Sequence, residues 1–320
     1  DVEKIRIFFK YMIQFLQGDC IEKIKELQNN SIDCVVTSPP YWGLRDYGVD
    51  GQLGLEKTYQ EHIQNIVKLF KVIKPKLKDS ATIWLNYGDS YASTVNGTKA
   101  KNIKNDDRGF VDKPFSTIQG NIKPKDLVMM PNRIAIALQE NGWWIRSEII
   151  WHKPNPMPES TKDRPTNCHE KLWLITKSKN YYYNADAIKE DSIYAPNKTH
   201  EKERPKGYYK GKWSSPEKGS RHDGSFKAIR EKKNKRNVWT IPTKPFKNAH
   251  FATFPPKLIE PCIKAGCPEN GIVLDPFGGA GTTGIVAKSL NRKSILIELN
   301  PKYINIAQKR VQEEFGLFND

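Results

Sequence analysis

Ten residues near the C-terminus decide the fold that this sequence predicts: Asp275-Pro276-Phe277-Gly278-Gly279-Ala280-Gly281-Thr282-Thr283-Gly284. They follow the apolar run 271–274, so a short buried strand is expected to end in the Asp275 carboxylate. The glycines lack a Cβ and let the backbone approach a ligand closely. Thr282 or Thr283 is expected to cap a helix that runs from Gly284 to Leu290. A second strand, 294–298, ends in Glu298 at about the spacing where an acid meets ribose hydroxyls in nucleotide-binding βαβ units.

A dinucleotide or phosphate site is the alternative for the same loop. A loop that cradles phosphates has Lys followed by Ser or Thr after its glycines, and that pair is missing here. The Asp275 carboxylate would also repel a pyrophosphate, whereas it suits a ligand that carries an ammonium or sulfonium group. A tight turn without a ligand is the remaining alternative, but it does not explain why two strands each end in an acid.

A second loop of interest follows the β-branched run 31–36, which predicts another buried strand. Its sequence is Thr37-Ser38-Pro39-Pro40-Tyr41-Trp42. Two consecutive prolines cannot extend a sheet and hold the chain on one path. The Ser38 hydroxyl and the Pro39 carbonyl are acceptors and Tyr41 offers a flat face, so a planar amine can lie on Tyr41 with its hydrogens directed at the two oxygens. A proline-rich turn over a packed aromatic is the alternative.

Together the two loops resemble the motifs of the DNA amino-methyltransferases, which use S-adenosylmethionine to methylate the exocyclic amine of cytosine or adenine. The order, catalytic loop first and cofactor loop last, resembles the permuted beta group. The matching segments bracket nearly the whole chain, and the middle matches less specifically. The resemblance implies an α/β, Rossmann-like methyltransferase fold, with a mostly parallel twisted sheet, an antiparallel edge hairpin and a basic target-recognition insertion. It implies S-adenosylmethionine as the cofactor and no metal.

The resemblance also assigns roles to individual residues. The catalytic set is Ser38, Pro39, Pro40 and Tyr41. The cofactor-binding set is Asp19, Thr253, Phe254, Asp275, Phe277, Gly279, Gly281, Thr282, Thr283 and Glu298. Asp19 is equally suited to cap a helix over 21–27, and core packing is the alternative for Phe254. Ser at the first position of the catalytic motif is typical of cytosine-N4 enzymes and Asp of adenine-N6 enzymes. We therefore expect N4 of a flipped cytosine as the target, with adenine N6 as the alternative.

Three further candidates come from the middle of the chain. Asn86 and Asp89 follow a predicted strand, where open α/β sheets bind ligands, although loop capping is the preferred interpretation. Trp151, His152 and Lys153 begin the loop of a predicted hairpin that lies near the flipped base in this resemblance; a structural or solvated role is the alternative. Cys262 follows Pro261 as in carbon-5 cytosine methyltransferases, but it falls within a predicted helix, 257–265, so we expect a core cysteine.

The charge of the chain is concentrated in one segment. The 320 residues carry a net charge of +16, with a pI near 9.4. Residues 189–236 hold fifteen Lys/Arg against seven Asp/Glu, interleaved with aromatic residues. Such a composition favours contact with DNA phosphates and bases; a solvated, disordered basic insertion is the alternative. The DNA-binding candidates are Lys227, Arg230, Lys232, Lys233, Lys235 and Arg236.

These features predict three parts: a catalytic part over 1–188 with an insertion at about 95–126, a target-recognition region over 189–245, and a cofactor-binding part over 246–320. No apolar run is long enough to span a bilayer, and five scattered cysteines form no CxxC pair. A soluble, cytoplasmic protein without membrane contact is expected. Double-stranded DNA is the expected partner, with a cognate restriction enzyme and a second copy of the chain as further candidates. A catalytically silent DNA-binding subunit is the alternative of another class.

Overall fold

The computed structural model of this chain describes residues 12–94, 111–192, 232–243 and 254–315. The chain forms two compact units. One comprises residues 1–184 together with 237–320, and the other comprises residues 185–236. The first unit contains both loops that the sequence singles out, so it carries the candidate site.

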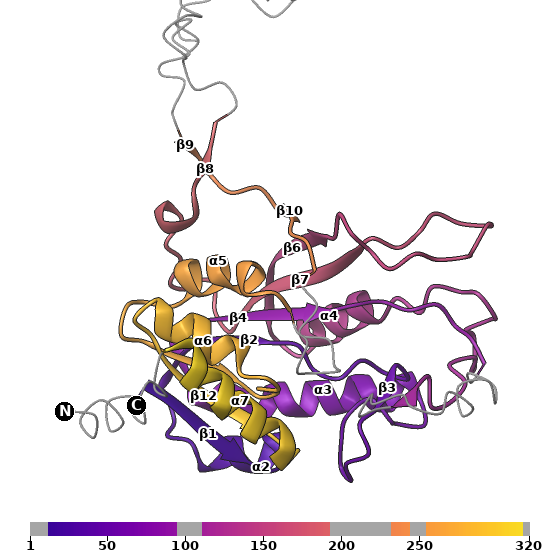
Figure 1. Cartoon of the computed structure of the whole chain (residues 1–320), viewed down its shortest axis with the longest axis horizontal. Helices are drawn as coiled ribbons and strands as arrows, with labels where there is room; N and C mark the ends of the chain where they lie inside the picture. The colour runs from indigo at the N-terminus through magenta and orange to yellow at the C-terminus, as the bar shows by residue number, and fades with distance from the viewer. Residues whose placement is uncertain (1–11, 95–110, 193–231, 244–253, 316–320) are drawn as a thin grey trace, which may run out of the picture. The chain divides into compact units, whose positions relative to one another are not determined.

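The larger unit is built on an eight-stranded sheet (Figure 1) with the order β1-β12-β11-β2-β4-β7-β6-β10. All neighbouring pairs are parallel except the two that involve β7. The sheet is therefore mostly parallel with an antiparallel β6–β7 hairpin, as predicted, and the short β10 adds one more strand beyond it. The strands are β1 Ile13–Gln17, β2 Ile32–Thr37, β4 Leu77–Tyr87, β6 Trp144–His152, β7 His169–Thr176, β10 Val238–Thr240, β11 Ile272–Asp275 and β12 Lys293–Glu298.

Helices cover both faces of the sheet. Every residue of β2 is buried, and so are the last seven of β4, which is the pattern of central strands in a sheet with helices on both sides. Contacts link α2 to α3 and α3 to α4, whereas α6 contacts both α5 and α7. The helices are α2 Cys20–Glu26, α3 Tyr59–Ile73, α4 Met130–Glu140, α5 Pro256–Gly266, α6 Thr282–Ser289 and α7 Pro301–Glu314, with a 3-10 turn, η1, at Lys74–Lys76. None of the helices in the described ranges has the length and apolar character needed to cross a membrane.

Two short strand pairs lie outside the main sheet. Arg45–Asp46 (β3) pairs with Val111–Asp112 (β5) in the larger unit. Glu190–Asp191 (β8) pairs with Lys232–Lys233 (β9) in the smaller unit, which also contains the 3-10 turn Asp186–Ile188 (η2). The described part of the expected 95–126 insertion is tied to the larger unit, because the Lys113 N–H donates to the Leu44 carbonyl at 2.9 Å.

Two expectations about helices have different outcomes. Cys262 lies fully buried within α5, as expected for a core cysteine. The expected threonine cap of α6 is wrong: its N-cap is Gly281, at φ 78°, and no side chain caps the helix. The reason is local competition, because the Thr283 hydroxyl donates to the Asp275 carboxylate at 2.6 Å.

Candidate active site

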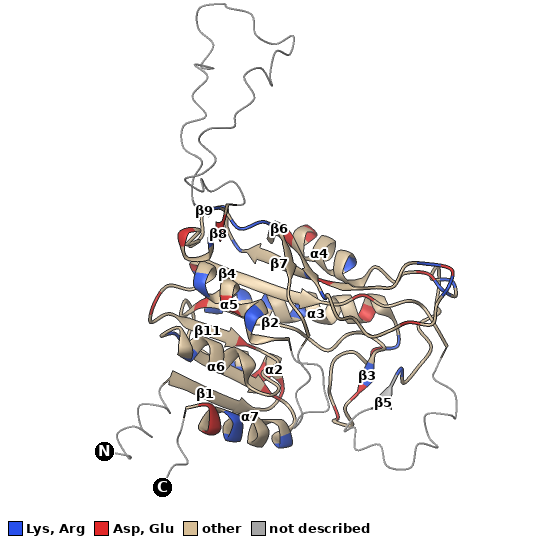
Figure 2. Ribbon diagram, turned by 45° about the horizontal axis from the view of Figure 1, so that its top comes forward, with Lys and Arg blue, Asp and Glu red and all other residues tan. Residues whose placement is uncertain are grey.

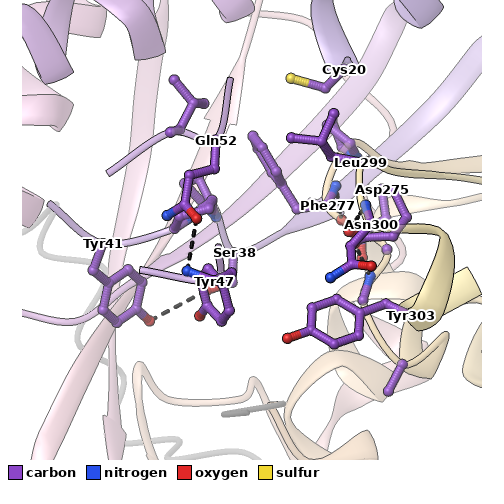
Figure 3. A pocket seen from close by; sticks show the side chains of 18 of the residues that line it. Cys20, Ser38, Tyr41, Tyr47, Gln52, Asp275, Phe277, Leu299, Asn300 and Tyr303 are labelled. Carbon is purple, nitrogen blue, oxygen red and sulfur yellow. Dashed lines mark hydrogen bonds between the residues drawn. The ribbon is translucent and has the colours of Figure 1, made fainter. Parts of the chain in front are cut away.

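A cavity of about 670 Å³ lies where the parallel strands β2, β11 and β12 end, and both loops line it. This is the edge at which open α/β sheets bind ligands. In Figure 3, Ser38 and Tyr41 lie on one side of the cavity, while Asp275, Asn300 and Tyr303 lie on the other. The predicted residues that line it are Asp19, Ser38, Pro39, Pro40, Tyr41, Phe254, Asp275, Phe277, Gly279, Thr282, Thr283 and Glu298.

The remaining predicted residues have other places. Gly281 is not among the lining residues; it begins α6, and a Cβ on it would lie 3.0 Å from the Ala307 Cβ. Thr253, Lys227 and Arg230 lie outside the described residues. Lys232, Lys233, Lys235 and Arg236 belong to the smaller unit.

Asp275 connects the two loops. Its Oδ1 accepts the Thr37 hydroxyl at 2.9 Å and the Phe277 N–H at 3.1 Å, and its Oδ2 accepts the Thr283 hydroxyl. Only 2% of the residue is exposed, and burial raises the pKa of the carboxyl to about 6 even though these hydrogen bonds lower it. Asp275 thus links the end of β2, through Thr37, to the first turn of α6, through Thr283.

Glu298 shapes the rim of the same cavity. Its Oε2 accepts the Gly279 N–H at 3.0 Å, and its Oε1 accepts the Asn300 N–H at 2.8 Å. Burial raises the pKa of this carboxyl, and the two N–H groups counteract that effect. Each carboxylate oxygen has a further lone pair, so Glu298 can still accept hydrogen bonds from the hydroxyls of a bound ligand.

The catalytic loop carries a chain of hydrogen bonds. The Ser38 hydroxyl donates to the Tyr41 Oη at 3.3 Å, and the Tyr41 hydroxyl donates to the Glu170 Oε2 at 2.9 Å. The Glu170 Oε2 also accepts the Asn86 amide at 3.0 Å, and the Glu170 Oε1 accepts the Lys153 ammonium at 2.5 Å. All five side chains line the cavity. Burial, with the Glu170 carboxylate nearby, raises the pKa of the Tyr41 hydroxyl well above its usual value, so the hydroxyl stays protonated.

Buried aromatic side chains pack against the catalytic loop on the side away from the cavity. The Tyr41 ring stacks on the Tyr87 ring with centroids 4.5 Å apart. The Tyr87 Oη accepts the Trp42 N–H at 2.8 Å and lies 2.9 Å from the His62 Nε2, while the His62 Nδ1 lies 2.8 Å from the Glu56 carboxylate. His62 is completely buried. This network fixes the path of the loop beneath the cavity.

We expect His62→Leu to lower the free energy of unfolding by about 1–3 kcal/mol, because it leaves the buried Tyr87 hydroxyl and Glu56 carboxylate without this partner. Urea unfolding followed by circular dichroism measures the change. Gln64→Leu, on the same helix outside the network, is the matched control. Equal stability of the His62→Leu and wild-type proteins would contradict a supporting role for the network.

The structure confirms some of the weaker candidates from the sequence and contradicts others. Asp89 is a cap as preferred, since its carboxylate accepts the Ser90 and Met130 N–H groups. Asn86 instead lines the cavity and bonds Glu170, so the preferred capping interpretation is wrong for it. Of the three hairpin candidates, Trp151 and Lys153 line the cavity and His152 does not. Other residues line the cavity without having been predicted from the sequence: Glu170, Gln52, Asn300 and Tyr303.

Fold and site together define an α/β protein of the Rossmann-like type, with a cavity shared by the Ser38 loop and the glycine loop. The model of the DNA methylase family matches residues 32–309. Type II methyltransferase M.Cfr9I of Citrobacter freundii is 43% identical over 298 residues, which are 93% of this chain and 87% of that protein. The chain therefore belongs to the DNA methylase family of the N6/N4 amino-methyltransferases.

Two solved structures have a similar fold. The PvuII DNA methyltransferase, described as cytosine-N4-specific, gives a TM-score of 0.62 at 18% identity, with 96% of this chain and 92% of that one covered. A putative DNA modification methylase of Thermus thermophilus, TTHA0409, solved in complex with S-adenosyl-L-methionine, gives a TM-score of 0.57 at 20% identity, with 95% of both chains covered. These two structures share the fold of this chain. The family match and the 43% identity to M.Cfr9I identify the chain as an S-adenosylmethionine-dependent DNA amino-methyltransferase.

The cavity residues fit this cofactor. Gly279, Gly281 and Gly284 have the G-x-G-x-x-G spacing that dinucleotide sites also use, so spacing alone does not separate the two ligands. The chemistry of the lining does: the carboxylates of Asp19 and Asp275 would repel a pyrophosphate, whereas they suit the positively charged groups of S-adenosylmethionine.

Proposed function

We propose that this DNA methyltransferase acts on the N4 amine of a cytosine flipped out of double-stranded DNA. The observation that carries the proposal is the Ser38 hydroxyl, which lines the cavity and donates its own hydrogen to Tyr41. Its lone pairs are thereby left to accept a hydrogen from a base amine. Ser in this position is typical of the cytosine-N4 enzymes of the family.

The catalytic loop acts by alignment. When bound, S-adenosylmethionine supplies a methyl group on a positively charged sulfur. Ser38 Oγ and the Pro39 carbonyl accept the two hydrogens of the base amine, which favours a pyramidal nitrogen whose lone pair points at the methyl group. Holding the two reactants in this orientation supplies most of the acceleration. Tyr41, whose ring is braced by Tyr87, stacks on the flipped base.

Lys153 gives a second reason to favour cytosine. Next to its amine cytosine carries two acceptors, N3 and O2, whereas adenine carries one acceptor, N1, followed by a C–H group. The Lys153 ammonium lines the cavity, 4.6 Å from the centroid of the Trp151 ring. An ammonium has three N–H donors, and Glu170 accepts one of them. The others suit a base edge with two acceptors.

The test is methyl transfer to mixed genomic DNA, with the digested nucleosides separated by mass spectrometry. The expected product is N4-methylcytosine. N6-methyladenine would overturn the choice of base and leave the mechanism standing. Absence of both products, with S-adenosylmethionine bound in a calorimetric control, would reject methyl transfer to these amines.

We further propose that residues 189–245 recognise the target, between a catalytic part over 1–188 and a cofactor-binding part over 246–320. The support is the excess of Lys and Arg over 189–236. In the described part of this segment, shown by charge in Figure 2, Glu190 pairs with Arg236 at 2.6 Å and with Lys233 at 3.7 Å. Replacing Lys232 and Lys235 leaves both of these ion pairs in place, so these two positions are chosen for the test.

Replacing Lys232 and Lys235 together by Gln should weaken DNA binding and reduce the slope of log K against log salt by up to about 2, since each lost phosphate contact removes about 0.9. Fluorescence anisotropy with a labelled duplex at a series of salt concentrations measures the slope. Lys264→Gln, which removes an ion pair with Glu260 on α5, is the control and should leave the slope unchanged. An unchanged slope in the double variant would remove these two lysines from the DNA interface.

A further inference from the structure

The hydrogen-bond chain at the catalytic loop has a direction, and Glu170 sets it. We propose that Glu170 is a positioning residue that fixes Ser38 as a hydrogen-bond acceptor for the base amine, acting through Tyr41. The inference rests on the proposed function, because it explains how the Ser38 oxygen is prepared for that amine. Three consecutive bonds carry it: Ser38 to Tyr41 at 3.3 Å, Tyr41 to Glu170 at 2.9 Å, and Lys153 to Glu170 at 2.5 Å.

The need for a direction follows from the chemistry of a serine hydroxyl. Ser38 has one hydrogen and two lone pairs, so its hydroxyl can either donate to a ligand or accept from it. An amine that is about to be methylated offers hydrogens, and a hydroxyl that points its own hydrogen at the nitrogen would compete for the lone pair that must attack the methyl group. Ser38 therefore works only when its hydrogen is directed elsewhere.

The ionised Glu170 carboxylate enforces this direction because it accepts hydrogen bonds and donates none. The single Tyr41 hydrogen goes to Glu170 at 2.9 Å rather than to the Asn86 Oδ1 at 3.3 Å. Once Tyr41 has donated, its oxygen can only accept within the chain, and the Ser38 hydrogen fills that place. Each member of the chain thus determines the orientation of the next.

Neighbouring groups keep Glu170 in the acceptor role. The Asn86 Nδ2 faces two acceptors, the Glu170 Oε2 at 3.0 Å and the Lys171 carbonyl at 3.2 Å, which fixes the orientation of that amide. The Lys153 ammonium donates to the Glu170 carboxylate and so holds that oxygen as an acceptor. Space is also restricted, since a Cβ on Gly88 would lie 2.7 Å from the Tyr41 ring and 3.2 Å from Glu170.

Glu170→Gln tests the direction with almost no change of shape. If the amide oxygen of the new side chain faces Lys153, its NH2 group faces both the Tyr41 hydroxyl and the Asn86 Nδ2, which is itself a donor. The Tyr41 hydrogen then turns to Ser38, which makes Ser38 a donor toward the base, or to the more distant Asn86 Oδ1 at 3.3 Å. If the amide oxygen faces Tyr41 instead, the NH2 group faces the ammonium, and two donors meet. Neither arrangement satisfies both neighbours with the original direction.

We expect Glu170→Gln to lower kcat about 10- to 100-fold, the range of one hydrogen bond to a charged group. The KM for DNA, the Kd for S-adenosylmethionine and the fluorescence increase of 2-aminopurine at the flipped position should stay within about twofold of wild type. Tyr41→Phe keeps the ring and removes the hydroxyl that connects Ser38 to Glu170, so its kcat should fall similarly. The two losses should not add in the double variant, because both variants break the same chain.

The matched control is Glu148→Gln, another Glu of the β6–β7 hairpin that pairs with a lysine, Lys171, and does not line the cavity. It should leave kcat unchanged. Wild-type kcat in Tyr41→Phe, or a Glu170→Gln defect found only in DNA affinity, cofactor affinity or base flipping, would overturn the inference. Tyr41→Phe leaves Glu170 with Lys153 and Asn86, so it decides the matter even if Glu170→Gln fails to fold. A wild-type enzyme that forms no N4-methylcytosine would instead reject the proposed function.

Discussion

Ser38→Ala is expected to lower kcat for DNA methylation on the order of 10²-fold, the cost of misplacing a reacting group by about an ångström or of losing one preorganised hydrogen bond in an active site. The side chain lines the cavity and is held by Tyr41, so its removal leaves one amine hydrogen without an acceptor. The backbone of the loop should not move, because the Trp42 N–H donates a hydrogen bond to the Tyr87 Oη. Affinity for S-adenosylmethionine should therefore stay close to that of the wild type.

Single-turnover methylation with labelled S-adenosylmethionine measures this loss, and titration calorimetry measures the cofactor affinity. Ser31→Ala provides the control, because Ser31 lies just before β2, the strand that Ser38 follows, and among the described contacts its hydroxyl bonds only the Gln28 carbonyl, at 2.7 Å. Undiminished turnover in Ser38→Ala would remove Ser38 from the mechanism.

Asp275→Asn is expected to remove a pH dependence of stability from the protein. The folded-state pKa of Asp275 is raised from 3.8 to about 6, so between these values the folded state binds more protons than the unfolded state. The contribution of Asp275 to stability is therefore largest below pH 4 and falls as the pH rises through 6. The total change is about 3 kcal/mol, since one pKa unit corresponds to about 1.4 kcal/mol.

Urea unfolding of wild type and Asp275→Asn at several pH values between 4 and 7 measures the effect. The difference in unfolding free energy, wild type minus variant, should fall with rising pH and level off above pH 6. Asp79→Asn is a suitable control, because Asp79 is almost fully exposed and makes only a surface ion pair with Lys177 in the described structure. Parallel curves for wild type and Asp275→Asn would contradict a raised pKa at this position.

The parts of the site that could be predicted are those that short stretches of sequence encode. An apolar run ending in Asp275 and followed by glycines specifies a strand and a close backbone turn without reference to the rest of the chain. The same holds for 31–36 and the two prolines that follow. That the two loops lie next to each other could also be predicted, because parallel strands place their carboxyl ends at one edge of a sheet. The register Leu274 opposite Val35 puts both loops there.

Glu170 could not be predicted, because its position depends on pairing between distant strands. It lies opposite Trp151 in β6 and next to the strand that ends with Asn86 and Tyr87. A charged residue at the start of an apolar strand is an ordinary feature in sequence, and only the register reveals that it reaches the catalytic loop. The threonine cap failed for a different, local reason: the buried Asp275 carboxylate, eight residues earlier in the same motif, accepts the Thr283 hydroxyl.

The neighbouring positions of β2 and β11 in the sheet make the order of the two loops along the chain irrelevant to the site. Val35 and Leu274 are partners in adjacent strands, although about three quarters of the chain separates them in sequence. On the far side of β11 from β2, the first and last of these strands in sequence, β1 and β12, also pair with each other. Among its described residues, the segment 185–236 contributes no strand to the eight-stranded sheet. We therefore expect that a circular permutant of this protein, with its new ends placed within residues 185–236, would carry the cofactor loop before the catalytic loop and form the same pocket.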